Sequence, residues 1–319
     1  MDLAPEQLQY LTTTEVLKES VTIPKSSPKT FSLITLTLVF PLSFAVLAHS
    51  LFTHPLLRQI ETQSPSNPKL PQEWARLLVF QFCYLIFLFA FSLLSTAAVV
   101  FTVASLYTSK PVSFTSTIYA IPRVFKRLLI TFLWVALLMI VYNFVFIASL
   151  VTLIIAIDNK SSLLFLFALA LILVSLVVHV YITALWHLAS VVSVLEPVYG
   201  IAAMRKSKDL LKGKTRMAAV LVFGYLSICG AIGGVFVSFV VHGGQNSGVF
   251  VRIVVGGVLV GVLVIVNLIG LLVQSVFYYV CKSHHHQGID KSALCDHLGG
   301  YLGDYVPLKS SVQMESMEI

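Results

Sequence analysis

The side chains that could do acid–base chemistry within the apolar parts of this chain are three histidines, His49, His179 and His187. Ionisable residues inside membrane segments usually mark a proton path, a transport path or an active site. The apolar stretches contain no Asp or Glu, so a proton relay would have no carboxylate. We therefore interpret the three residues as neutral, hydrogen-bonded structural histidines, and the sequence argues against a proton-driven pump.

Uncharged polar residues form a second group of candidates in the same stretches. They could hydrogen-bond between helices, which contributes about 0.6–2 kcal/mol each, or they could line a pore. Helix packing is the preferred interpretation. If a polar pathway exists, the residues that we expect to line it are Asn143, His179, Asn267 and Gln274.

A run of three histidines, His284–His286, lies close to Cys281 and His297 and resembles a metal-ligand cluster. Consecutive histidines do not share one face of a helix, however, and no paired-cysteine spacing accompanies them. We interpret the run as a solvated cluster beside the membrane. The sequence therefore predicts no metal site.

Catalytic motifs are also missing from the sequence. It has no nucleotide-binding glycine loop, no Gly-x-Ser-x-Gly and no His-Glu-x-x-His. We expect no catalytic residue and no cofactor. The remaining enzyme hypothesis would need a site around His187, Glu196 and Arg205.

The elements that must position all these residues are six long stretches without a charged residue. Hydrophobic residues make up 57% of the 319 residues and charged residues 11%, and the mean hydropathy is +0.91. A charge at the centre of a membrane helix costs about 2.5–3.5 kcal/mol, and about 20 apolar residues cross the hydrocarbon core. The sequence thus predicts an all-α integral membrane protein with six transmembrane helices, at about 31–51, 78–106, 128–156, 163–190, 217–241 and 253–280.

The distribution of Lys and Arg between the loops predicts the orientation. Most of them lie before the first span, in the second and fourth loops and after the last span. The positive-inside rule then places both termini in the cytosol. We expect a cytosolic segment at 1–30, a membrane domain at 31–280 and a cytosolic tail at 281–319.

Two of the basic loops, 110–126 and 196–212, resemble each other. Each begins with a proline where a span ends, which favours a new helix start, and each mixes apolar and basic residues at helical spacing. We interpret both as amphipathic helices in the cytosolic interface, forming a parallel internal repeat, with Pro122 kinking or splitting the first. Leu8, Leu11, Leu17 and Val21 could form the apolar edge of a third such helix.

The basic residues of these helices are expected to contact anionic lipid headgroups on the cytosolic side. No aromatic platform for bases accompanies them, so we expect no nucleic-acid partner. The residues concerned are Arg123, Lys126, Arg127, Arg205, Lys206, Lys208 and Lys212.

Glycines in the last two spans follow a pattern that allows membrane helices to approach closely. Gly230 and Gly234 are four residues apart, as are Gly257 and Gly261. The pattern predicts that spans five and six pack tightly against each other or meet a partner protein.

Several short segments resemble a plant-specific family of multi-pass membrane proteins often labelled polyadenylate-binding protein 1-B-binding protein. They are residues 23–30 (IPKSSPKT), 33–38 (LITLTL), 40–44 (FPLSF), 48–52 (AHSLF) and 296–303 (DHLGGYLG). The label implies an RNA-linked partner, which these residues do not support. Kaonashi-type relatives are associated with export of a boric acid channel from the endoplasmic reticulum. The 195–213 segment is also similar to the membrane domain beside bacterial glycerophosphodiester phosphodiesterases, without their catalytic domain.

The sequence and the resemblance together favour a non-enzymatic scaffold or cargo adaptor for membrane-protein trafficking in the early secretory pathway. Its expected partner is a client membrane protein, and its expected location is the endoplasmic reticulum or Golgi. The alternative is a transporter or channel for a small neutral solute or a lipid, because such a pathway needs no charged residue inside the membrane.

Overall fold

The computed structural model describes residues 8–62, 70–108, 114–243 and 248–286, and within these ranges the chain forms helices and no strand. Six helical stretches are long and apolar enough to cross a membrane. The prediction of an all-α protein with six membrane-crossing helices is therefore confirmed. The elements are α2 (Thr13–Ser26), α3 (Pro28–Ile34), η1 (Thr35–Val39), α4 (Phe40–Thr62), α5 (Leu70–Tyr107), α6 (Phe114–Asp158), α7 (Ser162–Leu195), α8 (Ile201–Leu211), α9 (Thr215–Phe236), η2 (Val237–Val241) and α10 (Val249–His284).

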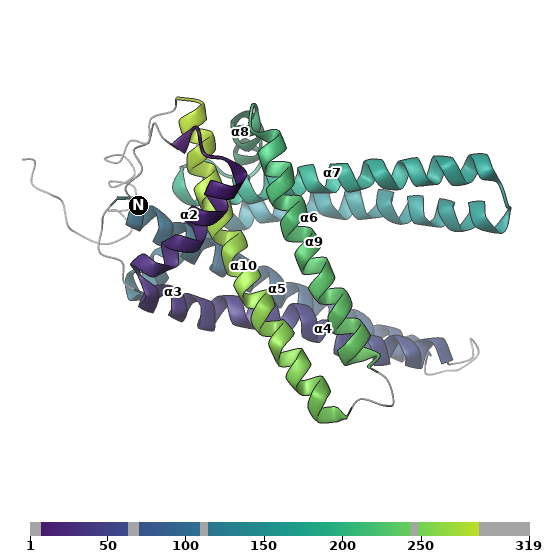
Figure 1. Ribbon diagram of the computed structural model, residues 1–319. Coiled ribbons are helices and arrows are strands. Elements are labelled where there is room, and N and C mark those ends of the chain that lie inside the picture. Colours follow the sequence, from purple (N-terminus) through teal and green to yellow (C-terminus); the bar gives the residue numbers. More distant parts are fainter. Residues whose placement is uncertain (1–7, 63–69, 109–113, 244–247, 287–319) are drawn as a thin grey trace, which may run out of the picture.

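The membrane-crossing helices are arranged as three antiparallel hairpins, α4–α5, α6–α7 and α9–α10, which diverge from a shared end (Figure 1). We call this shared end the base. It consists of α2, α8 and the last turns of α5, α7 and α10, together with the first turns of α6 and α9. Away from the base, α6 and α7 pack mainly against each other, and most of their apolar side chains are exposed.

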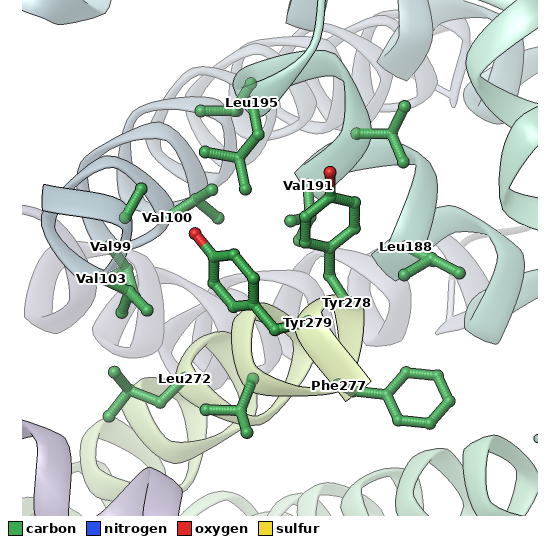
Figure 2. Close-up of a cluster of buried hydrophobic side chains, with 14 of the residues drawn as sticks. Val99, Val100, Val103, Leu188, Val191, Leu195, Leu272, Phe277, Tyr278 and Tyr279 are labelled. Atoms are coloured by element: carbon green, nitrogen blue, oxygen red, sulfur yellow. The ribbon is translucent and has the colours of Figure 1, made fainter. Parts of the chain in front are cut away.

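The main buried core lies in the base, where small and β-branched residues let the helices approach closely. Ala98, Val99 and Val103 on α5 and Val191 on α7 are fully buried. Figure 2 shows valines and leucines of α5 and α7 around two tyrosines of α10, Tyr278 and Tyr279. A second, smaller core joins η1, α4, α9, η2 and α10. The α6–α7 hairpin is therefore anchored at the base alone. The α4–α5 and α9–α10 hairpins also contact each other far from the base, where His54 Nε2 lies 2.8 Å from His242 Nε2.

The amino-terminal helix α2 packs on the base rather than lying free in the interface. It begins at a capping box, in which Glu15 accepts a hydrogen bond from the Thr12 backbone at 2.7 Å. Of the residues predicted to form its apolar edge, Leu8 is buried, whereas Leu17 and Val21 are exposed on the outer surface. The buried stripe is instead Val16, Ser20 and Ile23.

The first predicted interfacial helix is not a separate element. Helix α6 runs from Phe114 to Asp158 with Pro122 inside it. Ile121, Val124 and Leu128 are buried in the base on both sides of the proline. This packing compensates for the hydrogen bond that the proline removes, so the helix is not split. The resemblance between 110–126 and 196–212 therefore does not extend to their helical structure, and residues 109–113 lie outside the described chain.

The second predicted interfacial helix is a separate element, α8, which turns back between α7 and α9. Its start is not at Pro197, as the sequence pattern indicated, but after Gly200. Gly200 has φ +63° and ψ −136°, a conformation that is strained for any residue with a Cβ. Its N–H donates to Thr131 Oγ1 of α6 at 2.7 Å, and Thr131 also bonds Ser193 of α7. The turn into α8 is thus fixed to both helices of the α6–α7 hairpin.

Replacing Gly200 with alanine should destabilise the base. The new Cβ would lie 3.3 Å from Ile130 Cγ2 and 3.4 Å from Trp134 Cδ1, in a backbone conformation that disfavours it. We expect a loss of about 1–3 kcal/mol, measured by thermal unfolding of the purified protein in detergent. The control is Gly224→Ala in α9, where a Cβ meets nothing within 4 Å. Equal stability of the two variants would contradict this account.

Candidate functional site

A cavity of about 200 Å³ lies where the three hairpins meet, just beyond the base. Every one of the six membrane-crossing helices contributes to its wall. The polar side chains that line it are Ser92, Thr96, His179, Thr183, His187, Ser190, Tyr225, Asn267 and Gln274. The wall contains no Asp, Glu, Lys or Arg side chain. The cavity is therefore a polar but formally uncharged space between membrane-crossing helices.

Two hydrogen-bonded groups hold the wall together. His187 Nδ1 of α7 lies 2.6 Å from Gln274 Oε1 of α10, and because an amide oxygen only accepts, the histidine nitrogen donates. Asn267 of α10 accepts from Tyr225 of α9 at 2.9 Å and donates to Ser43 of α4 at 2.8 Å. These bonds connect all three hairpins, so the polar side chains are held in position by contacts between helices.

Three polar atoms of the cavity wall have no hydrogen-bond partner in the described chain. They are Thr183 Oγ1, His179 Nδ1 and Gln274 Nε2. Thr183 is 4% exposed and Gln274 is 7% exposed. An unpaired polar atom that is buried costs about 1–3 kcal/mol. The three side chains thus border the cavity, and within the described chain no protein atom pairs with their buried polar atoms.

The structure brings together three of the four residues proposed for a polar pathway. His179, Asn267 and Gln274 all line the cavity. Asn143 does not, because it is exposed on α6 and donates to the Met139 carbonyl of its own helix at 2.8 Å. Asn143 therefore lies apart from the other three residues.

Thr183 and Ser190 were missed, although the sequence contains a signal for both. His179, Thr183 and His187 are spaced by four residues, and Ser190 follows three later, which places them along one face of a helix. In α7, all four border the cavity. A polar stripe of this kind in a membrane-crossing helix could have been read from the spacing alone.

Two of the three histidines predicted within the spans have hydrogen-bond partners on neighbouring helices. His187 bonds Gln274, and His49 Nε2 lies 2.9 Å from Gln81 Oε1 of α5. In the cluster His284–His286, His285 Nε2 lies 3.1 Å from the carbonyl oxygens of Leu210 and Lys212, at the end of α8. These partners give His49, His187 and His285 structural roles.

A cluster of charged and polar groups closes the base at the end of α7. Glu196 is 8% exposed and accepts hydrogen bonds from Tyr278 at 2.6 Å, from Lys282 at 3.4 Å and from Lys206. The cluster joins the ends of α7 and α10 to α8. Burial tends to raise the pKa of Glu196, but the hydrogen bonds from Lys206 and Tyr278 and the charge of Lys282 outweigh it and lower the pKa.

The basic residues proposed to contact lipid divide into two groups in the structure. Arg205, Lys208, Lys212 and Lys126 are exposed, so they remain available for headgroups. Lys206 instead forms an ion pair with Glu196, and Arg127 Nη1 is buried without a hydrogen-bond partner in the described chain. The ion pair of Lys206 depends on the turn at Gly200, which brings Glu196 to its side and is not evident from the spacing of the basic residues. The side chain of Arg123 and the tail after His286 lie outside the described residues.

The glycine pattern does not form the contact between α9 and α10. A Cβ at Gly230, Gly234, Gly257 or Gly261 would meet nothing within 4 Å. The glycines at the contacts are others: a Cβ at Gly256 would lie 3.6 Å from Phe236, and one at Gly270 would lie 2.9 Å from Tyr225. The contacting faces of the two helices carry Ile232, Phe236 and Val260, and the predicted glycines lie on other faces.

Comparison with protein families places this chain in one family. The family model described as a domain of unknown function, DUF8558, matches residues 1–317, so the chain belongs to that family. Neither curated proteins nor solved structures gave a match. The chain is a multi-pass membrane protein by its six helices.

Replacing Glu196 with glutamine should destabilise the base, because Lys206 and Lys282 would lose their common carboxylate. We expect a loss of about 1–3 kcal/mol near neutral pH, measured by thermal unfolding in detergent. Asp209→Asn is the matched control, since the ion pair of Asp209 with Lys212 is exposed, and it should leave the unfolding temperature unchanged. Equal shifts in the two variants would contradict a structural role for the cluster.

The difference in stability between wild type and Glu196→Gln should depend on pH in a defined direction. The pKa of Glu196 is lower in the folded state than its ordinary value of 4.5, so its contribution to stability is complete above that value. It is lost as the pH falls through the lowered pKa. The difference in unfolding temperature between wild type and Glu196→Gln should stay constant from pH 7 to pH 5 and shrink below about 4.5. A difference that widens on acidification would refute the assignment.

Proposed function

We propose that this protein is a non-enzymatic membrane scaffold or cargo adaptor that binds a transmembrane helix of a client membrane protein. The observation that carries the proposal is the position of Asn143. It lies near the middle of the Val124–Asp158 span, and it faces outward from the α6–α7 hairpin. Within the described chain, its amide bonds only its own helix.

An outward-facing amide at this depth is poorly matched to lipid. Hydrocarbon offers no hydrogen-bond partner, and a polar group without one costs free energy. Asparagine side chains in membrane helices accordingly pair across helix–helix contacts, at about 0.6–2 kcal/mol per bond. The neighbours Ile140, Phe144 and Ile147 are exposed and would supply the apolar part of such a contact.

The glycines of α9 and α10 support the same proposal from a different hairpin. Gly230, Gly234, Gly257 and Gly261 lie on faces that the described part of the chain does not cover. Small residues at this spacing let a second helix approach closely. The resemblance to kaonashi-type proteins also favours a role in membrane-protein export, and with it a location in the endoplasmic reticulum or Golgi.

In this proposal the base faces the cytosol. The exposed basic residues of α8 and the start of α9, such as Arg205, Lys208 and Arg216, lie at that end. The positive-inside rule assigns it to the cytosolic surface, where these residues would contact anionic headgroups. The two termini would then be cytosolic as well.

Asn143→Leu should weaken client binding. In cells that lack the protein, we expect a defined set of membrane proteins to be missing from the cell surface, and the wild-type chain to restore them. Because the variant loses one interhelical hydrogen bond, it should retain about 3- to 30-fold less of the client on purification. Surface proteomics and quantitative co-purification in mild detergent measure the two effects.

Ile147→Leu, one turn further along the same exposed face, is the matched control and should restore surface delivery fully. Both variants should unfold at the wild-type temperature, because neither position is buried. An unchanged surface proteome in the null cells would refute the adaptor role. Recovery of only a second copy of this chain through Asn143 would show that the face serves self-association.

The alternative function is transport of a small neutral solute or a lipid. The cavity lined by His179, Asn267 and Gln274 favours it, because its wall is polar and carries no Asp, Glu, Lys or Arg. Flux of a neutral solute into liposomes containing the purified protein would support this alternative over the adaptor role.

A further inference from the structure

We propose that the polar cavity and an apolar groove beside it together bind one membrane lipid with an uncharged, hydroxyl-bearing head. The head would occupy the cavity, and the hydrocarbon chain would lie in the groove. This binding site is independent of the proposed adaptor role, since it uses neither Asn143 nor the exposed glycines.

The groove has a volume of about 360 Å³ and is formed by α2, α7, α9 and α10. Its wall is almost entirely apolar, with Leu188, Leu221, Val273 and Phe277 among its residues, and Gly224 widens it from the α9 side. An apolar groove between membrane helices matches a lipid chain in chemistry and shape.

The groove and the cavity share part of their walls. His187, Tyr225, Gly270 and Gln274 line both spaces. Gly270 permits the close approach, because a Cβ there would lie 2.9 Å from the ring of Tyr225. The polar ends of His187 and Gln274 thus mark the boundary between an apolar and a polar compartment, which is the pattern that an amphipathic molecule would match.

The unpartnered atoms of the cavity indicate the chemistry of the head. Gln274 Nε2 is a donor, the Thr183 hydroxyl both donates and accepts, and His179 Nδ1 does one or the other. Hydroxyl groups can satisfy all three, since each donates and accepts. A hydroxyl-bearing head would therefore remove the cost of leaving these atoms unpaired.

The same walls argue against a charged head. Neither lining contains Lys or Arg, so a phosphate in the cavity would have no cation beside it. Burying an unpaired charge costs far more than burying a hydroxyl group. The volume of about 200 Å³ corresponds to roughly six or seven waters at ~30 Å³ each, which fits a glycerol-sized head.

Water is the competing occupant, because a few waters could also satisfy the three atoms. The groove separates the two cases. A side chain that fills the groove should prevent a lipid from binding, whereas water in the cavity should be unaffected. Gly224→Leu fills the groove, and Gly233→Leu is the matched control on the same helix, since a Cβ meets nothing within 4 Å at either position.

The first experiment is to purify the full chain from its native membrane in mild detergent and to quantify the retained lipids by mass spectrometry. We expect one class of uncharged, hydroxyl-bearing lipid to be retained by the wild type and by Gly233→Leu. Gly224→Leu should lose most of it. Unfolding temperatures of the two leucine variants must agree, so that lipid loss is not confused with misfolding.

The polar contacts are tested by Thr183→Val and Gln274→Leu, which keep the side-chain volume and remove the hydrogen-bonding atoms. Each should reduce the retained lipid about 3- to 10-fold. Thr152→Val is the control, because Thr152 of α6 is only partly buried, does not line the cavity or the groove, and bonds only the Ala148 carbonyl within the described chain.

Binding of radiolabelled dioctanoylglycerol, dioctanoyl phosphatidate and free glycerol distinguishes the sources of the head. Preference for dioctanoylglycerol, abolished by Gly224→Leu, would support the proposal. Retention of charged lipids alone, equal retention by all variants, or glycerol binding that ignores Gly224→Leu would each overturn it. The last result would indicate a solute site in place of a lipid site.

Discussion

The structure depends on close packing at one end of the bundle, the base. Ala98 and Val99 of α5, Val191 of α7 and Tyr279 of α10 are buried there with almost no exposed surface. In a membrane the hydrophobic effect does not drive helices together, so this contact relies on van der Waals packing and hydrogen bonds. Glu196 completes it, because its carboxylate holds Lys206 and Lys282 where the apolar core ends.

Concentrating the packing at one end has a direct consequence for the rest of the molecule. The hairpins diverge beyond the base (Figure 1), and space remains between them where the divergence begins. The cavity occupies that position, and the exposed faces of α6, α7, α9 and α10 extend beyond it. A single constraint therefore accounts both for an internal polar site and for outer surfaces that lipid or another protein must cover.

The sequence predicts the six spans well, because the cost of a charge in hydrocarbon excludes charged residues from the middle of each. The helices themselves extend beyond the predicted bounds, as α5 does by beginning at Leu70. The sequence predicts contacts poorly. The glycines have the spacing of a close helix contact, yet the faces of α9 and α10 that pack together are those of Phe236 and Val260. Likewise, the basic character of 196–212 can be read from the sequence. The pairing of Lys206 with Glu196 cannot, because it depends on the turn at Gly200. Periodicity assigns residues to a face of a helix, whereas the neighbouring helix decides which face is buried.

Most polar side chains inside the described bundle have hydrogen-bond partners, some of them on neighbouring helices, and a few do not. Ser43, Tyr225 and Asn267 satisfy one another across three helices, as His49 and Gln81 do across two. Thr183 Oγ1 and Gln274 Nε2 are buried without a partner in the described chain, as are other atoms such as the hydroxyl groups of Ser105 and Tyr279 in the base. Asn143 is an exception of another kind, since it is exposed at mid-span. In a bilayer neither arrangement is favourable unless a further molecule supplies the missing hydrogen bonds. The unpaired atoms beside the cavity and the exposed amide at mid-span are therefore the observations on which the two proposed binding sites rest.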